Sequence, residues 1–315
     1  MTRERMKKSK KVEKKRASKQ VMTIHNATSR NHTVKFPARI QKQLTYRVGV
    51  FGFWNTKPRK LRGVLDKAFG QIFDAHDGPR LALLPGVVSH GKGWPQGHDE
   101  VCRTAAKHRV AVLFEAVLPD GNAAYHACKA SGKLLPVQIP QRFATSQQAN
   151  RHPTVVADLL ADCKPGRERT VNLEGLPIGL LICGENNILT NKQSDKAVRN
   201  RPSVRHHPDA NLFEHVPVVF NGAHFNMGNW GKLSRRCEYL SRDGRWCFYA
   251  ANSDQNDWGC STLYAYHDSN KLANSSGIIS DVARPFAIRR IADEPDKERF
   301  VALSLDIPGA LLTQY

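Results

Sequence analysis

The chain has 315 residues, 40% of them hydrophobic, and a formal net charge of +20. This length supports one large domain or two modest ones. The longest apolar runs, such as Leu176–Cys183, are far too short to span a bilayer, and no apolar stretch follows the basic N-terminus as it would in a secretory signal. Seven cysteines without CxxC spacing are typical of a reduced cytoplasmic protein rather than a disulfide scaffold or a zinc module.

Much of the charge lies at the N-terminus. Residues 1–20 hold ten lysines and arginines against Glu4 and Glu13, a net charge of +8. Because a lysine-rich block without aromatic residues cannot bury a core, we expect residues 1–40 to form a disordered basic arm ahead of one domain over residues 41–315. The arm either contacts nucleic acid loosely or serves as a solubilising tail.

The next part of the chain alternates between apolar runs of strand length and amphipathic segments. Apolar residues at helical spacing predict a helix over residues 59–75, and a second helix is predicted over residues 98–108. Ser131-Gly132 favours a hairpin turn. Strands are predicted at residues 47–53, 81–85, 110–114, 123–129 and 133–139.

The second half continues this alternation, which predicts an α/β fold with a largely buried sheet. A helix is predicted over residues 233–239, and the polar, basic residues 186–212 are expected to form a long loop. Strands are predicted at residues 178–183, 216–220, 245–251, 261–266 and 300–305.

Cys183 is the best candidate for a nucleophile, because it ends a buried strand and Gly184 follows at once. A sharp turn there brings a side chain to the sheet edge, where α/β folds bind ligands. Glycine permits the bend and lets a substrate approach closely. A thiol in this place acts as a nucleophile when a base or cation makes the thiolate available; without one it is an inert core residue.

The order of these segments resembles the nitrilase superfamily, the carbon–nitrogen hydrolases. The most specific match is Glu174–Asn186, because Cys183-Gly184-Glu185-Asn186 is a known form of the family's nucleophile strand. The resemblance covers roughly residues 45–307, and its other segments match mainly in their order: Tyr46–Phe53, Leu81–Pro85, Val218–His224, Arg235–Asn252, Gly259-Cys260-Ser261 and Arg299–Ile307.

The resemblance implies a four-layer α-β-β-α sandwich, a homo-oligomer, and a Glu-Lys-Cys triad acting on a small amide or nitrile. In that mechanism the Cys forms a thioester, the Glu is the general base and the Lys stabilises the oxyanion. No metal or cofactor is implied, and the spacing of His206, His207 and His215 fits no standard ligand pattern.

Two of the three triad positions depart from the family pattern. The Glu position, after the Pro that ends the second strand, is Gly86, and the Lys position, counted from Gly132, is Pro140. A small gap in the alignment would place Arg142 at the Lys position, where it supplies positive charge but no usable proton.

Three explanations compete for these departures. Glu115 ends the third strand and reaches the same cleft as a relocated carboxylate, or it is an ordinary surface carboxylate. His224 follows a buried strand with Asn221 and serves as the base for Cys183, or it is a loop histidine bonded to backbone. In the third explanation the fold persists and binds a ligand without turning it over.

The residues around Cys183 have two interpretations. Gly184, Glu185, Asn186, Asn221 and Arg142 are candidate substrate-binding residues, whereas a carboxylate at Glu185 also suits the cap of a following turn. The sequence therefore predicts a hydrolase of amides or nitriles with Cys183, Glu115 and His224 as catalytic residues. The alternative is a catalytically impaired binding protein, associated with nucleic acid through its basic arm.

Overall fold

The computed structural model describes residues 44–53, 58–86, 94–117, 122–191, 198–200, 212–224, 229–252, 262–293, 300–312 and 315. All of them belong to the unit Thr33–Tyr315. The expected basic arm lies outside the described residues. Within the described ranges, no helix is both long and apolar enough to cross a membrane.

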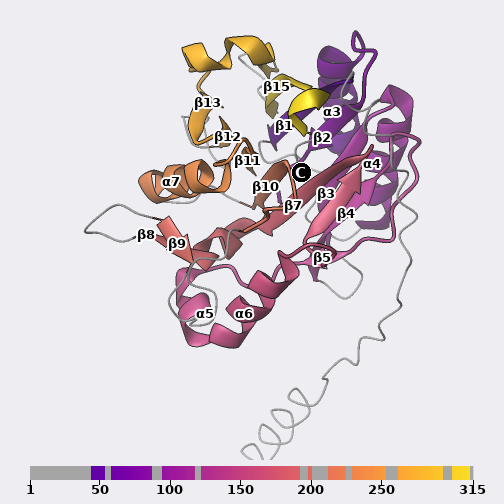
Figure 1. Ribbon diagram of the computed structural model, residues 1–315. Coiled ribbons are helices and arrows are strands. Elements are labelled where there is room, and N and C mark those ends of the chain that lie inside the picture. Colours follow the sequence, from indigo (N-terminus) through magenta and orange to yellow (C-terminus); the bar gives the residue numbers. More distant parts are fainter. Residues whose placement is uncertain are drawn as a thin grey trace, which may run out of the picture. The chain divides into compact units, whose positions relative to one another are not determined.

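The described domain is built on two mixed β-sheets (Figure 1). Each sheet has a parallel centre flanked by antiparallel strands: β1 pairs with β2 in parallel and with β15 antiparallel, and β10 lies parallel to both β7 and β11. The first sheet has the order β14 (Arg289–Ala292), β15 (Phe300–Pro308), β1 (Thr45–Phe53), β2 (Arg80–Leu83), β3 (Ala111–Val117), β4 (Ala123–Cys128) and β5 (Ile139–Pro140). The second has the order β13 (Asn270–Asn274), β12 (Leu263–His267), β11 (Trp246–Ala251), β10 (Val218–Ala223), β7 (Leu176–Ile182) and β6 (Thr170–Leu173).

Helices cover the outer face of each sheet, as Figure 1 shows. On the seven-stranded sheet, α3 (Pro58–Phe73) and α4 (Trp94–His108) pack against the outward side chains of β1, β2 and β3. On the six-stranded sheet, α5 (Ser146–Arg151), α6 (Pro153–Asp162) and α7 (Trp230–Leu240) pack against β7, β10 and β11. The fold is therefore the expected four-layer α-β-β-α sandwich.

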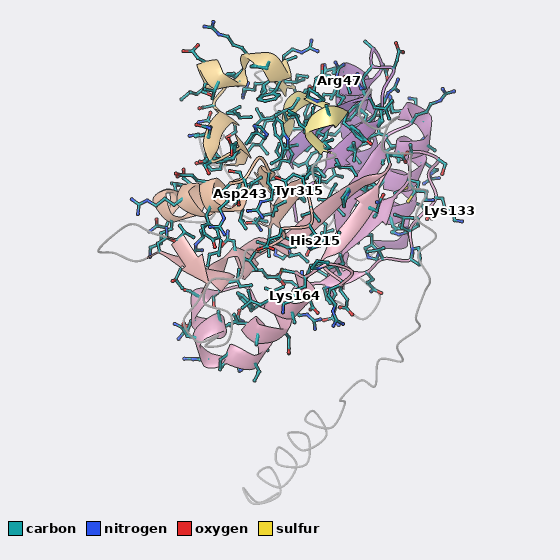
Figure 2. The ribbon with its side chains drawn as sticks, viewed as in Figure 1. Arg47, Lys133, Lys164, His215, Asp243 and Tyr315 are labelled. Carbon is teal, nitrogen blue, oxygen red and sulfur yellow. The ribbon has the colours of Figure 1, made fainter. Side chains whose placement is uncertain are left out.

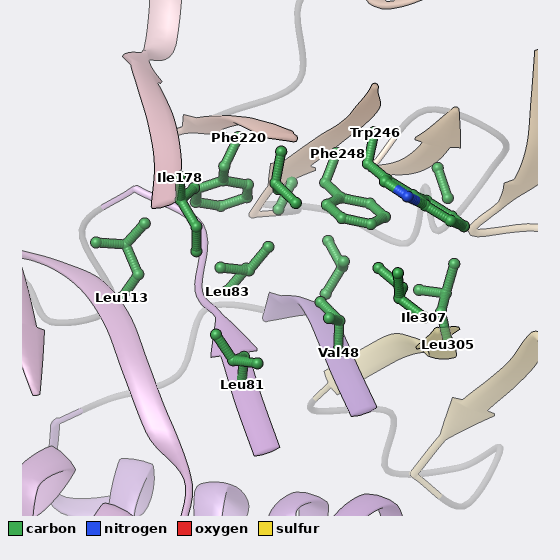
Figure 3. Packing of buried hydrophobic residues seen from close by; sticks show 14 of the residues in the cluster. Val48, Leu81, Leu83, Leu113, Ile178, Phe220, Trp246, Phe248, Leu305 and Ile307 are labelled. Atoms are coloured by element: carbon green, nitrogen blue, oxygen red, sulfur yellow. The ribbon is translucent and has the colours of Figure 1, made fainter. Parts of the chain in front are cut away.

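The largest hydrophobic cluster fills the space between the two sheets. Figure 3 shows Val48 and Leu83 of the first sheet facing Phe220 and Phe248 of the second. Alternation along each strand produces this arrangement, since successive side chains point to opposite faces. In β3, for example, Leu113 faces the other sheet and Phe114 faces the helices.

Most predicted elements are present, with shifted ends, but the segment after the first hairpin differs. The hairpin turn forms, with Gly132 at φ +82° and the Lys129 amide bonded to the Lys133 carbonyl. The predicted strand over residues 133–139 is reduced to an isolated bridge at Leu134 and to β5, which covers only Ile139–Pro140. Pro136 and Pro140 cannot donate to a ladder, which limits strand formation here.

The expected long loop over residues 186–212 is also partly wrong. Its first residues belong to the 3₁₀ helix η1 (Cys183–Ile188), and a small hairpin of β8 (Leu189–Asn191) and β9 (Val198–Asn200) follows. Other elements were not predicted: α5, α6, β6, β13, β14 and the 3₁₀ helices η2 (Asp281–Phe286) and η4 (Gly309–Leu312). All of them except α6 have six residues or fewer, too few to show a clear period. The helix α6 buries Val156, Leu159 and Leu160 at helical spacing, a signal that sequence reasoning overlooked.

Gly179, in the middle of β7, offers a test of how tightly the six-stranded sheet packs against the turn that carries Phe213. A Cβ there would lie 2.4 Å from the ring of Phe213, whereas a Cβ at Gly63 of α3 would meet nothing within 4 Å. We expect Gly179→Ala to lower the free energy of unfolding by about 1–3 kcal/mol through overpacking. Gly63→Ala, the matched control, should raise it by about 0.5–1 kcal/mol because alanine favours a helix. Urea denaturation measures both, and equal effects would contradict the packing argument.

Candidate active site

The backbone turns sharply where β7 ends. Cys183 is the first residue of η1 and has φ +48°, in the left-handed region. A residue with a Cβ pays roughly 1–2 kcal/mol for this conformation, so surrounding contacts must hold it. The turn leaves the Cys183 side chain partly exposed, although Ile182 before it and Gly184 after it are buried.

Gly184 is required by the packing of this turn. A Cβ at residue 184 would lie 1.6 Å from the carbonyl oxygen of Ala144. The sequence suggested that glycine lets a substrate approach here, but the group that occupies this side of Gly184 is the chain's own backbone.

Glu115, His224 and Cys183 come together between the two sheets. His224 Nε2 lies 2.6 Å from Glu115 Oε2, and the imidazole also hydrogen-bonds the Cys183 thiol. The Glu115 side chain is fully buried, and that of His224 is 24% exposed. The structure therefore joins Glu115 and His224, which the sequence offered as alternative partners of Cys183, in one chain of contacts.

The contacts among these side chains change the pKa values of Cys183 and His224. Burial would raise the pKa of the Cys183 thiol, but hydrogen bonds from the His224 side chain and from the His224 and Gly184 backbone lower it overall. Burial opposes protonation of His224, yet its bonds to Cys183 and Glu115 raise the pKa of the imidazole to about 10. This pairing favours a thiolate beside an imidazolium over the neutral pair of thiol and imidazole.

Strand alternation explains why these side chains meet. In β3, Leu113 faces the second sheet, so Glu115 two residues later faces it as well. In β10, Phe220 and Gly222 face the first sheet, and His224 continues this row just past the strand. Gly222 leaves space for the Tyr125 side chain, because a Cβ at residue 222 would lie 1.7 Å from Tyr125 Oη.

Gly86, at the position where the resemblance puts a catalytic Glu, makes room for His224. A Cβ at Gly86 would lie 2.4 Å from His224 Cδ2 and 2.8 Å from the His224 backbone nitrogen. The Gly86 amide donates to the Ala223 carbonyl at 2.9 Å, and Asn252 Nδ2 donates to the Gly86 carbonyl at 2.5 Å. The ends of β2, β10 and β11 are thus joined across the two sheets. Sequence reasoning missed this use of Asn252.

Glu185 stabilises the turn at Cys183 through hydrogen bonds to Arg169 and to two backbone amides. Its carboxylate is fully buried and accepts two hydrogen bonds from Arg169, with Nη1 at 2.8 Å and Nη2 at 2.9 Å. It also accepts from the backbone amides of Ile182 at 2.9 Å and Arg142 at 2.5 Å. Burial raises the pKa of Glu185, and Arg169 opposes that rise. These contacts are those of a cap, the second of the two interpretations from sequence.

Asn186 and Asn221 also lie behind the nucleophile. Asn186 Nδ2 donates to Asn221 Oδ1 at 2.9 Å, and Asn221 Nδ2 donates to the carbonyls of Leu181 at 3.1 Å and Cys183 at 3.3 Å. Both asparagines are buried. The structure places them as supports of the Cys183 turn, and their role in binding a substrate stays a prediction.

The Arg142 guanidinium takes a different direction from the one expected. Its Nη2 pairs with Asp162 at 3.0 Å and Glu168 at 3.4 Å, so only its backbone amide serves the Cys183 turn. At the expected Lys position, the Pro140 carbonyl accepts from Arg169 at 3.0 Å. Sequence reasoning missed Arg169, because it lies just before β6, a strand that gave no signal.

Of the three histidines considered as metal ligands, one lies within the described residues. His206 and His207 lie outside the described residues. His215, labelled in Figure 2, is hydrogen-bonded through Nε2 to Thr170 Oγ1 at 2.9 Å. Within the described ranges, no group of three or more His, Cys, Asp or Glu side chains is arranged to hold a metal ion.

This architecture is similar to that of solved amidase structures. A Cys→Ala variant of the amidase from Nesterenkonia AN1, described as a nitrilase-superfamily protein, matches with a TM-score of 0.50 and 12% identity, over 86% of this chain and 94% of that chain. The chain has the nitrilase-superfamily fold. A second variant of the same amidase, with the acetamide moiety of fluoroacetamide on its active-site cysteine, matches with the same TM-score, identity and coverage. No family model matches the sequence, and no curated protein does.

The nitrilase-like fold of this chain therefore carries its own set of charged residues. The resemblance in sequence implies a Glu after β2 and a Lys after the hairpin, and the structure has Gly86 and Pro140 at those places. In their stead, the space between the sheets holds Glu115 and His224 beside Cys183.

The buried ion pair beneath the turn can be tested by charge removal. Glu185→Gln leaves the Arg169 guanidinium buried opposite a neutral group, so we expect the free energy of unfolding to fall by about 3–5 kcal/mol. Glu168→Gln, which removes an exposed carboxylate paired with Arg142, should cost at most about 1 kcal/mol. Urea denaturation followed by tryptophan fluorescence compares them. A Glu185→Gln variant as stable as Glu168→Gln would refute the structural role.

The pairing of Cys183 with His224 predicts how its reactivity depends on pH. A thiol with a lowered pKa is thiolate over a wider range, so alkylation by iodoacetamide should rise with pH at a midpoint below that of an ordinary thiol. In His224→Gln burial remains but the positive charge is gone, and the midpoint should move upward. Peptide-resolved mass spectrometry follows Cys183, with the partly exposed Cys102 as an internal control whose rate should not change. An unchanged Cys183 midpoint in His224→Gln would disprove the pairing.

Proposed function

We propose that this protein hydrolyses small amides through a thioester on Cys183, with His224 as general acid and base and Glu115 as the carboxylate that orients it. The observation that carries the proposal is the position of His224, which hydrogen-bonds both Glu115 and the Cys183 thiol. A nucleophile, a base in contact with it and a third group that orients the base form the arrangement used in covalent catalysis.

The first half-reaction releases the amine. With Nε2 engaged by Glu115, Nδ1 is the ring nitrogen available to the thiol. The Cys183 thiolate adds to the amide carbon, forming a C–S bond as the carbonyl electrons move to oxygen. When the carbonyl re-forms, the C–N bond breaks and the imidazolium of His224 gives its proton to the leaving nitrogen. The products are ammonia or an amine and a thioester on Cys183.

The second half-reaction releases the acid. His224, now neutral, takes a proton from water as the water adds to the thioester carbon. The C–S bond breaks, the sulfur leaves as thiolate, and the imidazolium is restored beside Glu115. The sum is amide plus water to carboxylic acid plus amine. Because the carboxylate is fully buried, its charge favours the imidazolium in each cycle.

Backbone amides take the oxyanion role that the resemblance assigns to a lysine. The N–H groups of Gly184 and His224 face the Cys183 sulfur, and the carbonyl oxygen of a bound substrate develops its charge next to that sulfur. Fixed amide donors of this kind need no reorganisation during the reaction, and a single one can contribute a few kcal/mol to lowering the barrier.

The substrate class follows from the same chemistry. A protonated His224 suits a leaving group that needs a proton, as the nitrogen of an amide does. The structurally similar amidase, which carries an acetamide moiety on its cysteine, supports small amides as the first compounds to test, with nitriles after them. Contact with nucleic acid through residues 1–20, a homo-oligomer and a cytoplasmic location stay predictions.

The proposal predicts an acyl-enzyme that depends on two side chains. The protein is incubated with p-nitrophenyl acetate and a panel of short amides and nitriles. Mass spectrometry should find an acetyl group on Cys183, and at least one amide should release ammonia. Cys183→Ala should abolish both, and His224→Gln should slow acylation by roughly 10²-fold or more. Above about pH 10, where His224 loses its proton, ammonia release should fall.

Controls separate the enzyme from its alternatives. Cys102→Ala removes a thiol far from the proposed chemistry in sequence and should leave both readouts unchanged. Ammonia release that survives Cys183→Ala would disprove the nucleophile. Acetylation of Cys183 without ammonia from any member of the panel would instead favour the catalytically impaired binding protein.

A further inference from the structure

A buried arginine lies behind the nucleophile turn. Arg236, on α7, is 5% exposed, and its Nη1 donates to Asn186 Oδ1 at 2.9 Å and to Asn187 Oδ1 at 3.0 Å. Its Nε donates to Asn191 Oδ1 at 3.3 Å. One guanidinium thus contacts side-chain oxygens of three asparagines in and just after η1.

The chemistry of the guanidinium fixes the direction of these amides. Arg carries only donors, so each asparagine must turn its oxygen toward Arg236 and its NH₂ group away. The Asn187 NH₂ accordingly donates to the Gly184 carbonyl at 2.8 Å. The Asn186 NH₂ donates to Asn221 Oδ1 at 2.9 Å.

Asn221 links the orientation of the Asn186 amide to the Cys183 turn. Because its oxygen is taken by Asn186, its NH₂ faces the carbonyls of Leu181 at 3.1 Å and Cys183 at 3.3 Å. The carbonyls of Leu181, Cys183 and Gly184 thus each accept a hydrogen bond from an asparagine NH₂ group. The orientation of these NH₂ groups is set by Arg236, directly or through Asn186. If the side-chain amide of Asn186, Asn187 or Asn221 were rotated by 180°, its oxygen would face the oxygen that now accepts from its NH₂ group.

The Cys183 turn needs such support. A left-handed φ of +48° at a residue with a Cβ is strained, and relaxation of this turn would move the thiol relative to His224 and to the backbone amide of Gly184. These are the groups that lower the pKa of Cys183. Holding the neighbouring carbonyls therefore holds the thiol in register with its base.

We propose that Arg236 is a positioning residue, which sets the amide orientation of Asn186, Asn187 and Asn221 and through them keeps Cys183 against His224. Its importance for turnover rests on the proposed function, but its effect on the thiol does not require any substrate. The Arg236 guanidinium contacts Asn186, Asn187 and Asn191 and acts through these asparagines.

The test measures the pH midpoint of Cys183 alkylation by iodoacetamide, resolved by peptide, in the full chain. This midpoint reports the thiol together with the ionisable groups coupled to it, His224, Glu115 and Tyr125. Arg236→Met should raise the midpoint and slow alkylation at neutral pH by about tenfold or more, as one unit of pKa implies. Arg236→Lys, which keeps donors, should restore part of the effect. Arg235→Met, the neighbouring residue on α7, should leave the midpoint unchanged.

Isosteric variants keep the test decisive if Arg236→Met does not fold. Asn187→Leu and Asn221→Leu keep a neutral side chain of similar size but lose the NH₂ that holds the backbone carbonyls, and each should raise the midpoint. Loss of thermal stability with an unchanged midpoint in these variants, or in a folded Arg236→Met, would overturn the proposal. A raised midpoint in Arg236→Met, together with a wild-type chain that forms no acyl-enzyme, would uphold the positioning role and defeat the proposed hydrolase.

Discussion

The contact between Glu115 and His224 is the constraint on which the site depends, because it crosses from one sheet to the other. Glu115 belongs to β3 of the seven-stranded sheet, and His224 follows β10 of the six-stranded sheet. A fully buried carboxylate requires a cationic or hydrogen-bonding partner. His224 meets that requirement, its pKa rises as a result, and the charge that it gains favours the thiolate of Cys183. The reactivity of the thiol is thus tied to how the two sheets pack.

Small residues make this crossing possible. Packed sheets lie roughly 10 Å apart, a space that large side chains fill elsewhere in the core. Around the crossing, Gly86 leaves room for the imidazole and Gly222 leaves room for Tyr125 Oη, which donates to the Leu84 carbonyl at 3.1 Å. The two glycines lie on opposite sheets, so each sheet yields space to a polar group anchored on the other.

The sequence predicted the architecture well because long apolar strands and amphipathic helices carry a strong period. Cys183 could be found from its strand and the glycine after it, and Glu115 and His224 from their places beyond buried residues. Their union could not be predicted, since Glu115 inside β3 and His224 just past β10 are more than a hundred residues apart and meet only through the packing of two sheets. The roles of Arg169 and Arg236 had no sequence signal, because a buried arginine reads like a surface one until its partners are known.

The glycine at residue 86 and the histidine at residue 224 belong together. A Glu side chain at residue 86 would need the volume that His224 fills, since even a Cβ comes within 2.4 Å of the imidazole. Restoring the Glu while His224 stays would collide with the ring. Removing His224 would leave Glu115 buried without its imidazole and Cys183 without the contact that lowers its pKa. A Glu at residue 86 and the imidazole of His224 therefore exclude each other in the same space.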